Sequence, residues 1–145
     1  MIYLLRHGDA EPGDGERDAE RELTAKGRRQ AEAAGRALAV LGVELDACLT
    51  SPKVRARDTA AIACRHLGLE PEETPELRGG LINARALSSG RGEVLLVGHE
   101  PDFSDEIAHL TGGQIKLKKG GLAAVEGRLL HMLLRPAELK AIAAE

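Results

Sequence analysis

The fold is decided by the stretch Ile2-Tyr3-Leu4-Leu5-Arg6-His7-Gly8, a short apolar run that stops at polar residues. Such a run is typical of a buried parallel strand that ends at the edge of a sheet. Residues 45–50 and 94–97 have the same form, and polar residues or a turn follow each of them. Segments with helical spacing separate the runs. We therefore expect an α/β fold with a mostly parallel sheet covered by helices on both faces.

Helix signals lie between the predicted strands. Thr24 is a suitable N-cap for a helix that reaches about residue 41 and is closed by Gly42. Ser51 is the predicted N-cap of a second helix, with Pro52 at its first position. A third helix is expected to begin near Pro101 and to stop at Gly112-Gly113.

The remaining segments are less regular. Residues 9–22 are predicted to form an exposed acidic loop and residues 69–80 a connecting loop, with a weak helix at about 81–89. Strands predicted at 115–118, 121–126 and 128–134 form an antiparallel edge, with a tight turn at Glu126-Gly127. A helix that begins at Pro136 completes the chain.

Composition limits the classes of protein to consider. The 145 residues suit one domain, residues 1–145, and the proportions of 43% hydrophobic and 30% charged residues are those of a soluble globular protein. A net charge of −3 argues against binding to nucleic acid or to an anionic membrane. No stretch approaches the ~20 apolar residues that span a bilayer. Cys48 and Cys64 have no metal-binding spacing, so we expect reduced thiols and a cytoplasmic protein.

Cationic and imidazole side chains follow three of the predicted strands. Arg6 and His7 follow the first, Arg55 lies in the first turn of the helix after the second, and His99 follows the third. Because the carboxyl ends of parallel strands meet at one edge of a sheet, we expect these four side chains to converge. Two guanidiniums and two imidazoles form a pocket suited to a tetrahedral dianion.

The chemistry of each residue is specific. A neutral ring nitrogen of His7 can act as a nucleophile, and Gly8 lets the backbone turn sharply beside a ligand. His99 can donate a hydrogen bond to phosphoryl oxygens as charge develops on them. Each residue alone also fits an ordinary structural role, but three strand ends carrying such side chains favour phosphotransfer. A metal site formed by His99 and the carboxylates of residues 100–105 lacks a recognised ligand spacing.

The motifs resemble those of the histidine phosphatase superfamily. They are Arg6-His7-Gly8, residues 23–31, Ser51-Pro52, Arg55-Ala56, Thr59-Ala60 and residues 98–101, in the order found in the family. The short length and the form Arg6-His7-Gly8-Asp9-Ala10 are most similar to the small SixA-type phosphohistidine phosphatases.

The resemblance implies a three-layer α/β/α sandwich of the phosphoglycerate mutase-like type and a two-step reaction. His7 would attack phosphorus and become phosphohistidine, and water would then release inorganic phosphate. Arg6, Arg55 and His99, with Gly8, would bind the phosphoryl group. Neither a metal nor another cofactor is expected.

One departure from the larger family members bears on the substrate. Their general-acid carboxylate lies in a long insertion, whereas the corresponding segment here, about 69–93, is short. Glu76 and Asp9 are therefore the candidate acids. Because imidazole leaves more readily than an alkoxide, the short segment favours phosphohistidine on a protein. The expected partner is a histidine-phosphorylated phosphorelay or phosphocarrier protein.

Other functions stay open from the sequence. A broad-specificity phosphomonoesterase for small molecules is the main alternative, and a position of Glu76 beside His7 would favour it. A mutase needs a more enclosed pocket than so short a chain is expected to form. A non-catalytic phosphoryl-binding module is a further possibility, although the nucleophile is present. A purely structural domain would leave the convergent cations unexplained.

Overall fold

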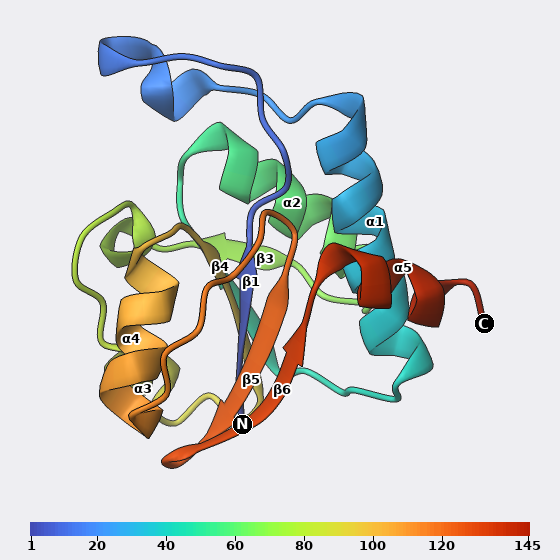
Figure 1. The fold of residues 1–145 in the computed structure, drawn as a ribbon, viewed down its shortest axis with the longest axis vertical. Coiled ribbons are helices and arrows are strands. Elements are labelled where there is room, and N and C mark those ends of the chain that lie inside the picture. Colours follow the sequence, from blue (N-terminus) through green and yellow to red (C-terminus); the bar gives the residue numbers. More distant parts are fainter.

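A six-stranded sheet in the order β3-β2-β4-β1-β5-β6 runs through the middle of the molecule (Figure 1). The computed structural model describes residues 1–145. Strands β1 (Ile2–Arg6), β2 (Ala47–Thr50), β3 (Pro71–Glu73) and β4 (Val94–Gly98) are parallel, whereas β5 (Leu122–Glu126) and β6 (Leu129–Leu134) are antiparallel. The predicted mostly parallel sheet with an antiparallel edge is confirmed.

The apolar runs form central strands because both of their faces are buried. Successive side chains of a strand point to opposite faces, so Leu4 and Leu5 belong to two different hydrophobic clusters. The strand β4 divides in the same way, with Leu96 in one cluster and Val97 in the other. An uninterrupted apolar run therefore supplies a core on each side of the sheet.

Helices cover both faces of the sheet and make three layers (Figure 1). One face carries α1 (Ala25–Val40), α2 (Val54–Cys64) and α5 (Pro136–Ala143). The opposite face carries α3 (Ala84–Ser88), α4 (Asp102–Thr111) and the short 3₁₀ helix η2 (Pro75–Leu77). A second 3₁₀ helix, η1 (Gly15–Glu20), lies between β1 and α1 in the sequence. The predicted three-layer sandwich is confirmed.

Local signals fix the ends of two helices. The Thr24 hydroxyl accepts a hydrogen bond from the Gly27 N–H at 3.0 Å, which caps α1 as predicted. The helix α4 ends at Gly112, whose φ of +80° favours glycine. Both helix ends therefore follow from single residues of the sequence.

Three predictions about the irregular segments are wrong. Residues 115–118 form no strand, because Leu117 is buried and its N–H donates to the side chains of Glu100 and Ser104. The predicted loop 69–80 contains β3, which forms by pairing with β2. The hairpin turn falls at Gly127-Arg128, one residue later than predicted.

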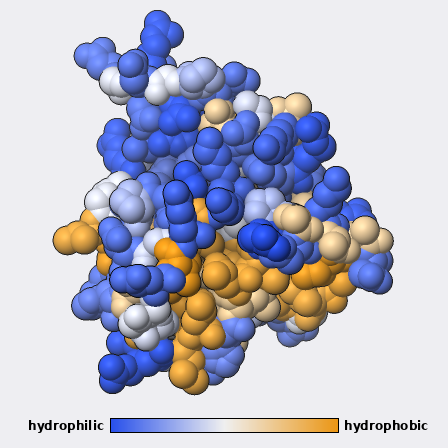
Figure 2. All heavy atoms as spheres, in the orientation of Figure 1, coloured by the Kyte–Doolittle hydropathy of each residue, from blue (hydrophilic) through white to orange (hydrophobic).

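The antiparallel edge carries an exposed hydrophobic surface. Leu129, Leu130 and Leu133 of β6 are exposed, and Figure 2 shows hydrophobic atoms where Figure 1 draws β5 and β6. Hydrophilic atoms cover the upper part of the same view, where η1 and the start of α2 lie. None of the helices has the length and apolar character needed to cross a membrane.

Candidate active site

The pairing of three parallel strands brings the predicted residues to one edge of the sheet. Arg6 at the end of β1 pairs with Gly98 at the end of β4, so His7 and His99 follow on neighbouring strands. Thr50 at the end of β2 pairs with Val97, which places Ser51 beside the end of β4. Ligands of α/β sheets bind at this carboxyl edge.

The ring of His7 is fixed by its own loop. It is 6% exposed, and its Nδ1 lies 2.7 Å from the Gly8 carbonyl oxygen. Because a carbonyl oxygen only accepts, Nδ1 carries the proton and Nε2 keeps its lone pair. Burial, together with the charges of Arg55 and Arg6, lowers the pKa of His7 to about 4. The Nε2 atom is therefore unprotonated near neutral pH, and its lone pair is available to an electrophile.

His99 is held in the same region by Ser51. Its Nε2 lies 2.8 Å from the Ser51 Oγ, whereas its buried Nδ1 has no hydrogen-bond partner in the protein. Burial, followed by the proximity of His7 and Arg55, lowers the pKa of His99 to about 3. The ring is neutral, and a proton on Nδ1 would have no acceptor within the protein.

Both arginines are partly anchored and keep donors free. The Arg6 Nη1 donates to the Leu117 carbonyl at 3.0 Å, and the Arg55 Nη1 donates to the Asp18 carbonyl at 2.7 Å. The Nε atoms of Arg6 and Arg55 are buried without a hydrogen-bond partner. Buried polar atoms are rarely left unpaired, so these nitrogens mark a place for an acceptor.

Gly8 is required by the close approach of α1. A Cβ atom at Gly8 would lie 2.5 Å from the Gly27 carbonyl oxygen, a backbone atom of the first turn of α1. The Gly8 N–H donates to the Thr59 Oγ1 at 3.1 Å, and that hydroxyl donates to the Arg55 carbonyl at 2.7 Å. Thr59 thus joins the loop that carries His7 to the helix that carries Arg55.

The predicted cap of α2 is wrong, and its residues have another role. The helix begins at Val54 with Lys53 as the N-cap, so Pro52 precedes it. The Ser51 Oγ accepts from the Lys53 N–H at 3.2 Å and faces His99. Arg55 nevertheless lies in the first turn, as predicted.

The two candidate acids do not join this cluster. The Asp9 carboxylate accepts from Thr24 at 2.8 Å and pairs with Lys119 at 3.4 Å, and the bond from Thr24 lowers its pKa. Glu76 is exposed and lines a separate depression of about 730 Å³ between β3 and α3. Neither carboxylate forms a hydrogen bond or an ion pair with His7.

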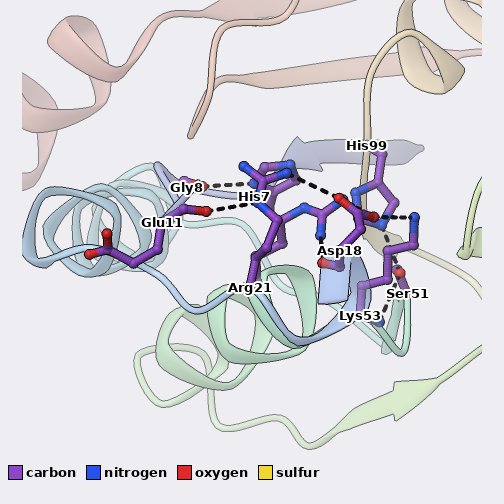
Figure 3. Close-up of polar contacts among 9 residues, drawn as sticks. His7, Gly8, Glu11, Asp18, Arg21, Ser51, Lys53 and His99 are labelled. Carbon is purple, nitrogen blue, oxygen red and sulfur yellow. Dashed lines mark hydrogen bonds and ion pairs between the residues drawn. The ribbon is translucent and has the colours of Figure 1, made fainter. Parts of the chain in front are cut away.

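Three further charged residues surround the cluster, and no sequence pattern predicted their role. Arg21, Lys53 and Asp18 lie around the two histidines in Figure 3. The charge of Arg21 lowers the pKa of His7, and that of Lys53 lowers the pKa of His99. Asp18 and Arg21 lie in the acidic segment after the first predicted strand, which is typical of a solvated loop, and Lys53 follows the second predicted strand.

Comparisons with known proteins agree with this geometry. The sequence profile of the histidine phosphatase superfamily (branch 1) matches residues 2–79. An uncharacterized protein of Picosynechococcus sp. (strain PCC 7002) is 34% identical over 134 residues, and the match covers 83% of this chain and 81% of that protein. The mitochondrial serine/threonine-protein phosphatase Pgam5 of Drosophila ananassae is 39% identical over 72 residues. That match spans 50% of this chain but only 25% of Pgam5.

A solved structure extends the similarity to nearly the whole chain. The protein histidine phosphatase SixA, solved in complex with tungstate, superposes with a TM-score of 0.82 at 26% identity. The superposition covers 96% of this chain and 99% of the SixA chain. The predicted resemblance to the superfamily, and to SixA within it, is confirmed.

Proposed function

Because this chain belongs to the histidine phosphatase superfamily (branch 1), whose members are phosphatases, we propose that it dephosphorylates a histidine-phosphorylated protein through a phosphohistidine on His7. The observation that carries the proposal is the hydrogen bond from the His7 Nδ1 to the Gly8 carbonyl. This hydrogen bond leaves Nε2 of His7 as the nucleophilic atom. The nearby side chains of Arg6, Arg55 and His99 each have a buried nitrogen without a hydrogen-bond partner.

In the first step, the His7 Nε2 attacks the phosphorus atom and forms a P–N bond, while the P–N bond to the substrate histidine breaks. The leaving ring departs as neutral imidazole when its other nitrogen carries a proton. The ring of His7 becomes positively charged, and the Gly8 carbonyl stabilises its Nδ1–H. In this proposal, Arg6 and Arg55, rather than a metal ion, neutralise the phosphoryl oxygens.

In the second step, water attacks the phosphorus of the phosphorylated His7, and the P–N bond to Nε2 breaks. The water supplies the fourth oxygen of inorganic phosphate, and its proton passes to the product or to solvent. His7 returns to the neutral form because Nδ1 has kept its proton throughout. The Nδ1–H of His99 donates to a phosphoryl oxygen in both steps, and the Ser51 hydroxyl donates to its Nε2.

The choice of phosphohistidine over a phosphate ester follows from the leaving group. An alkoxide has to be protonated as it leaves, whereas a protonated phosphohistidine loses neutral imidazole. Asp9 is bonded to Thr24 and Glu76 lines a separate depression, which argues against either carboxylate as the proton donor to an ester oxygen. The similarity to SixA, which is a protein histidine phosphatase, supports the same substrate class. Phosphorelay and phosphocarrier proteins carry such a group.

Hydrolysis of small phosphomonoesters is the second candidate, and the position and raised pKa of Asp102 favour it. This half-buried residue begins α4, three positions after His99, and burial raises the pKa of its carboxyl. A carboxyl whose pKa is raised in this way is a candidate proton donor to an ester leaving group. Asp102→Asn would then reduce ester hydrolysis and spare phosphohistidine.

The test compares two substrates and two forms of the enzyme. We expect rapid phosphate release from a histidine-phosphorylated carrier protein by the wild type, little from p-nitrophenyl phosphate, and none from either with His7→Ala. Activity on the ester alone would move the function to a phosphomonoesterase. Release that persists in His7→Ala would contradict the proposed nucleophile.

A further inference from the structure

Asp18 is the only carboxylate bound to the cations around His7 and His99 (Figure 3). Its Oδ2 lies 3.2 Å from the Lys53 Nζ and 3.3 Å from the Arg55 Nη2, and its Oδ1 lies 3.2 Å from the Arg21 Nη1. Its backbone carbonyl accepts from the Arg55 Nη1. A single residue therefore engages three cations.

Asp18 is ionised whenever the enzyme is folded near neutral pH. Burial raises its pKa, but hydrogen bonds from Lys53 and Arg21 and the charge of Arg55 outweigh burial and lower the pKa to about 2. The helix η1 that carries Asp18 has no buried residue. Polar contacts such as these, rather than packing, hold the segment against the site.

The cations form an inner and an outer group. Arg6 and Arg55 retain buried Nε donors for the phosphoryl group, as described above. Arg21 and Lys53 lie further out, with side chains 22% and 21% exposed, and both are paired with Asp18. Without that carboxylate, two adjacent cations at the mouth of the site would be available to a second anionic group of a substrate.

We propose that Asp18 determines specificity: it occupies Arg21 and Lys53 and restricts the site to phosphoryl groups that have no second anionic group close enough to reach these two cations. This inference rests on the proposed function, because it takes the surroundings of His7 to be the phosphoryl site. Phosphohistidine meets the restriction, since its imidazole has no negative charge. Phosphorylated carboxylic acids and bisphosphates do not, because their second anionic group would face the Asp18 carboxylate instead of unpaired cations.

The test measures binding, so it does not depend on turnover. Calorimetry compares ethyl phosphate with phosphoglycolate, which adds one carboxylate to a molecule of similar size. We expect the wild type to prefer ethyl phosphate, and Asp18→Asn to raise the affinity for phosphoglycolate relative to ethyl phosphate by about tenfold. The double variant Asp18→Asn with Lys53→Met should lose most of this gain.

Glu16→Gln is the matched control. It removes one negative charge from the same exposed helix, at a residue with no ion pair or hydrogen bond from its side chain, and should leave the ratio unchanged. Equal changes for both ligands in Asp18→Asn would overturn the inference, since Asp18 would then act only on Arg55. An equal effect of Glu16→Gln would also overturn it. If Asp18→Asn alters the ratio of the two affinities but the wild type releases no phosphate from the phosphoprotein, the proposed function alone would be rejected.

Discussion

The imidazole rings of His7 and His99 lie with their centroids 5.3 Å apart and their planes tilted by 57°. The register of β1 and β4 produces this pair, since each ring follows the last residue of a neighbouring strand. Burial and the nearby guanidiniums keep both rings neutral. In the proposed function, one neutral imidazole is the nucleophile and the other is a hydrogen-bond donor to the phosphoryl group.

The neutral pair predicts a pH-dependent stability. The pKa values of His7 and His99 are about 4 and about 3 in the folded protein, below the ordinary value of 6.5. Between those limits the unfolded chain binds more protons than the folded protein, so stability is greatest above pH 6.5 and falls as the pH decreases. In that range, each histidine lowers the free energy of unfolding by up to about 1.4 kcal/mol for every unit by which the pH decreases. Urea unfolding from pH 7 to pH 4.5 measures the slope.

Variants that never ionise provide the comparison. The double variant His7→Asn with His99→Asn should flatten the slope, whereas His109→Asn, at an exposed residue with no ion pair, should retain it. Identical slopes for the wild type and the double variant would show that the two rings are not the groups that resist protonation.

Thr59→Val tests the link between the His7 loop and α2. The Thr59 hydroxyl accepts from the Gly8 N–H and donates to the Arg55 carbonyl, and the residue is fully buried. Valine leaves the Gly8 N–H unpaired, so we expect a loss of about 1–3 kcal/mol in the free energy of unfolding. Phosphate release should fall as well. Thr59→Ser keeps the hydroxyl and should restore most of both; a stable, fully active valine variant would refute the link.

Ser51→Ala tests how the proton of His99 is placed. The Ser51 hydroxyl is the hydrogen-bond partner of Nε2, so its loss should let the proton redistribute between the two ring nitrogens. We expect phosphate release to slow by roughly tenfold, less than the loss of a transition-state donor itself. Nitrogen NMR shifts should change for His99 and stay constant for His7. Unchanged His99 shifts would mean that Ser51 does not set the tautomer.

The sequence was sufficient where a local pattern determines the structure. The apolar runs before His7 and His99 are β1 and β4, and Thr24 begins α1 as predicted. Arg6, His7, Arg55 and His99 gather at one edge because parallel strands place their carboxyl ends together. These features depend on periodicity and on the rules of sheet topology, both of which are visible in the sequence.

The sequence was insufficient where distant contacts decide. Strand β3 (Pro71–Glu73) has low strand propensity and exists because β2 pairs with it. The backbone at Leu117 bonds to the side chains of Glu100 and Ser104 instead of to a strand. Asp18 lies in an acidic segment without periodicity, and its contacts with Arg55 and Lys53 depend on how η1 folds back.

Trapping of the phosphorylated enzyme is the most direct test of the central claim. The enzyme is mixed with a histidine-phosphorylated carrier protein, quenched in alkali within its first turnovers, digested and examined by mass spectrometry. We predict an acid-labile phosphoryl group on the peptide that contains His7, absent from His7→Ala and present in the control His66→Ala. Phosphate release by the wild type with the phosphoryl group on another residue, or with no phosphorylated peptide at any time, would contradict His7 as the nucleophile.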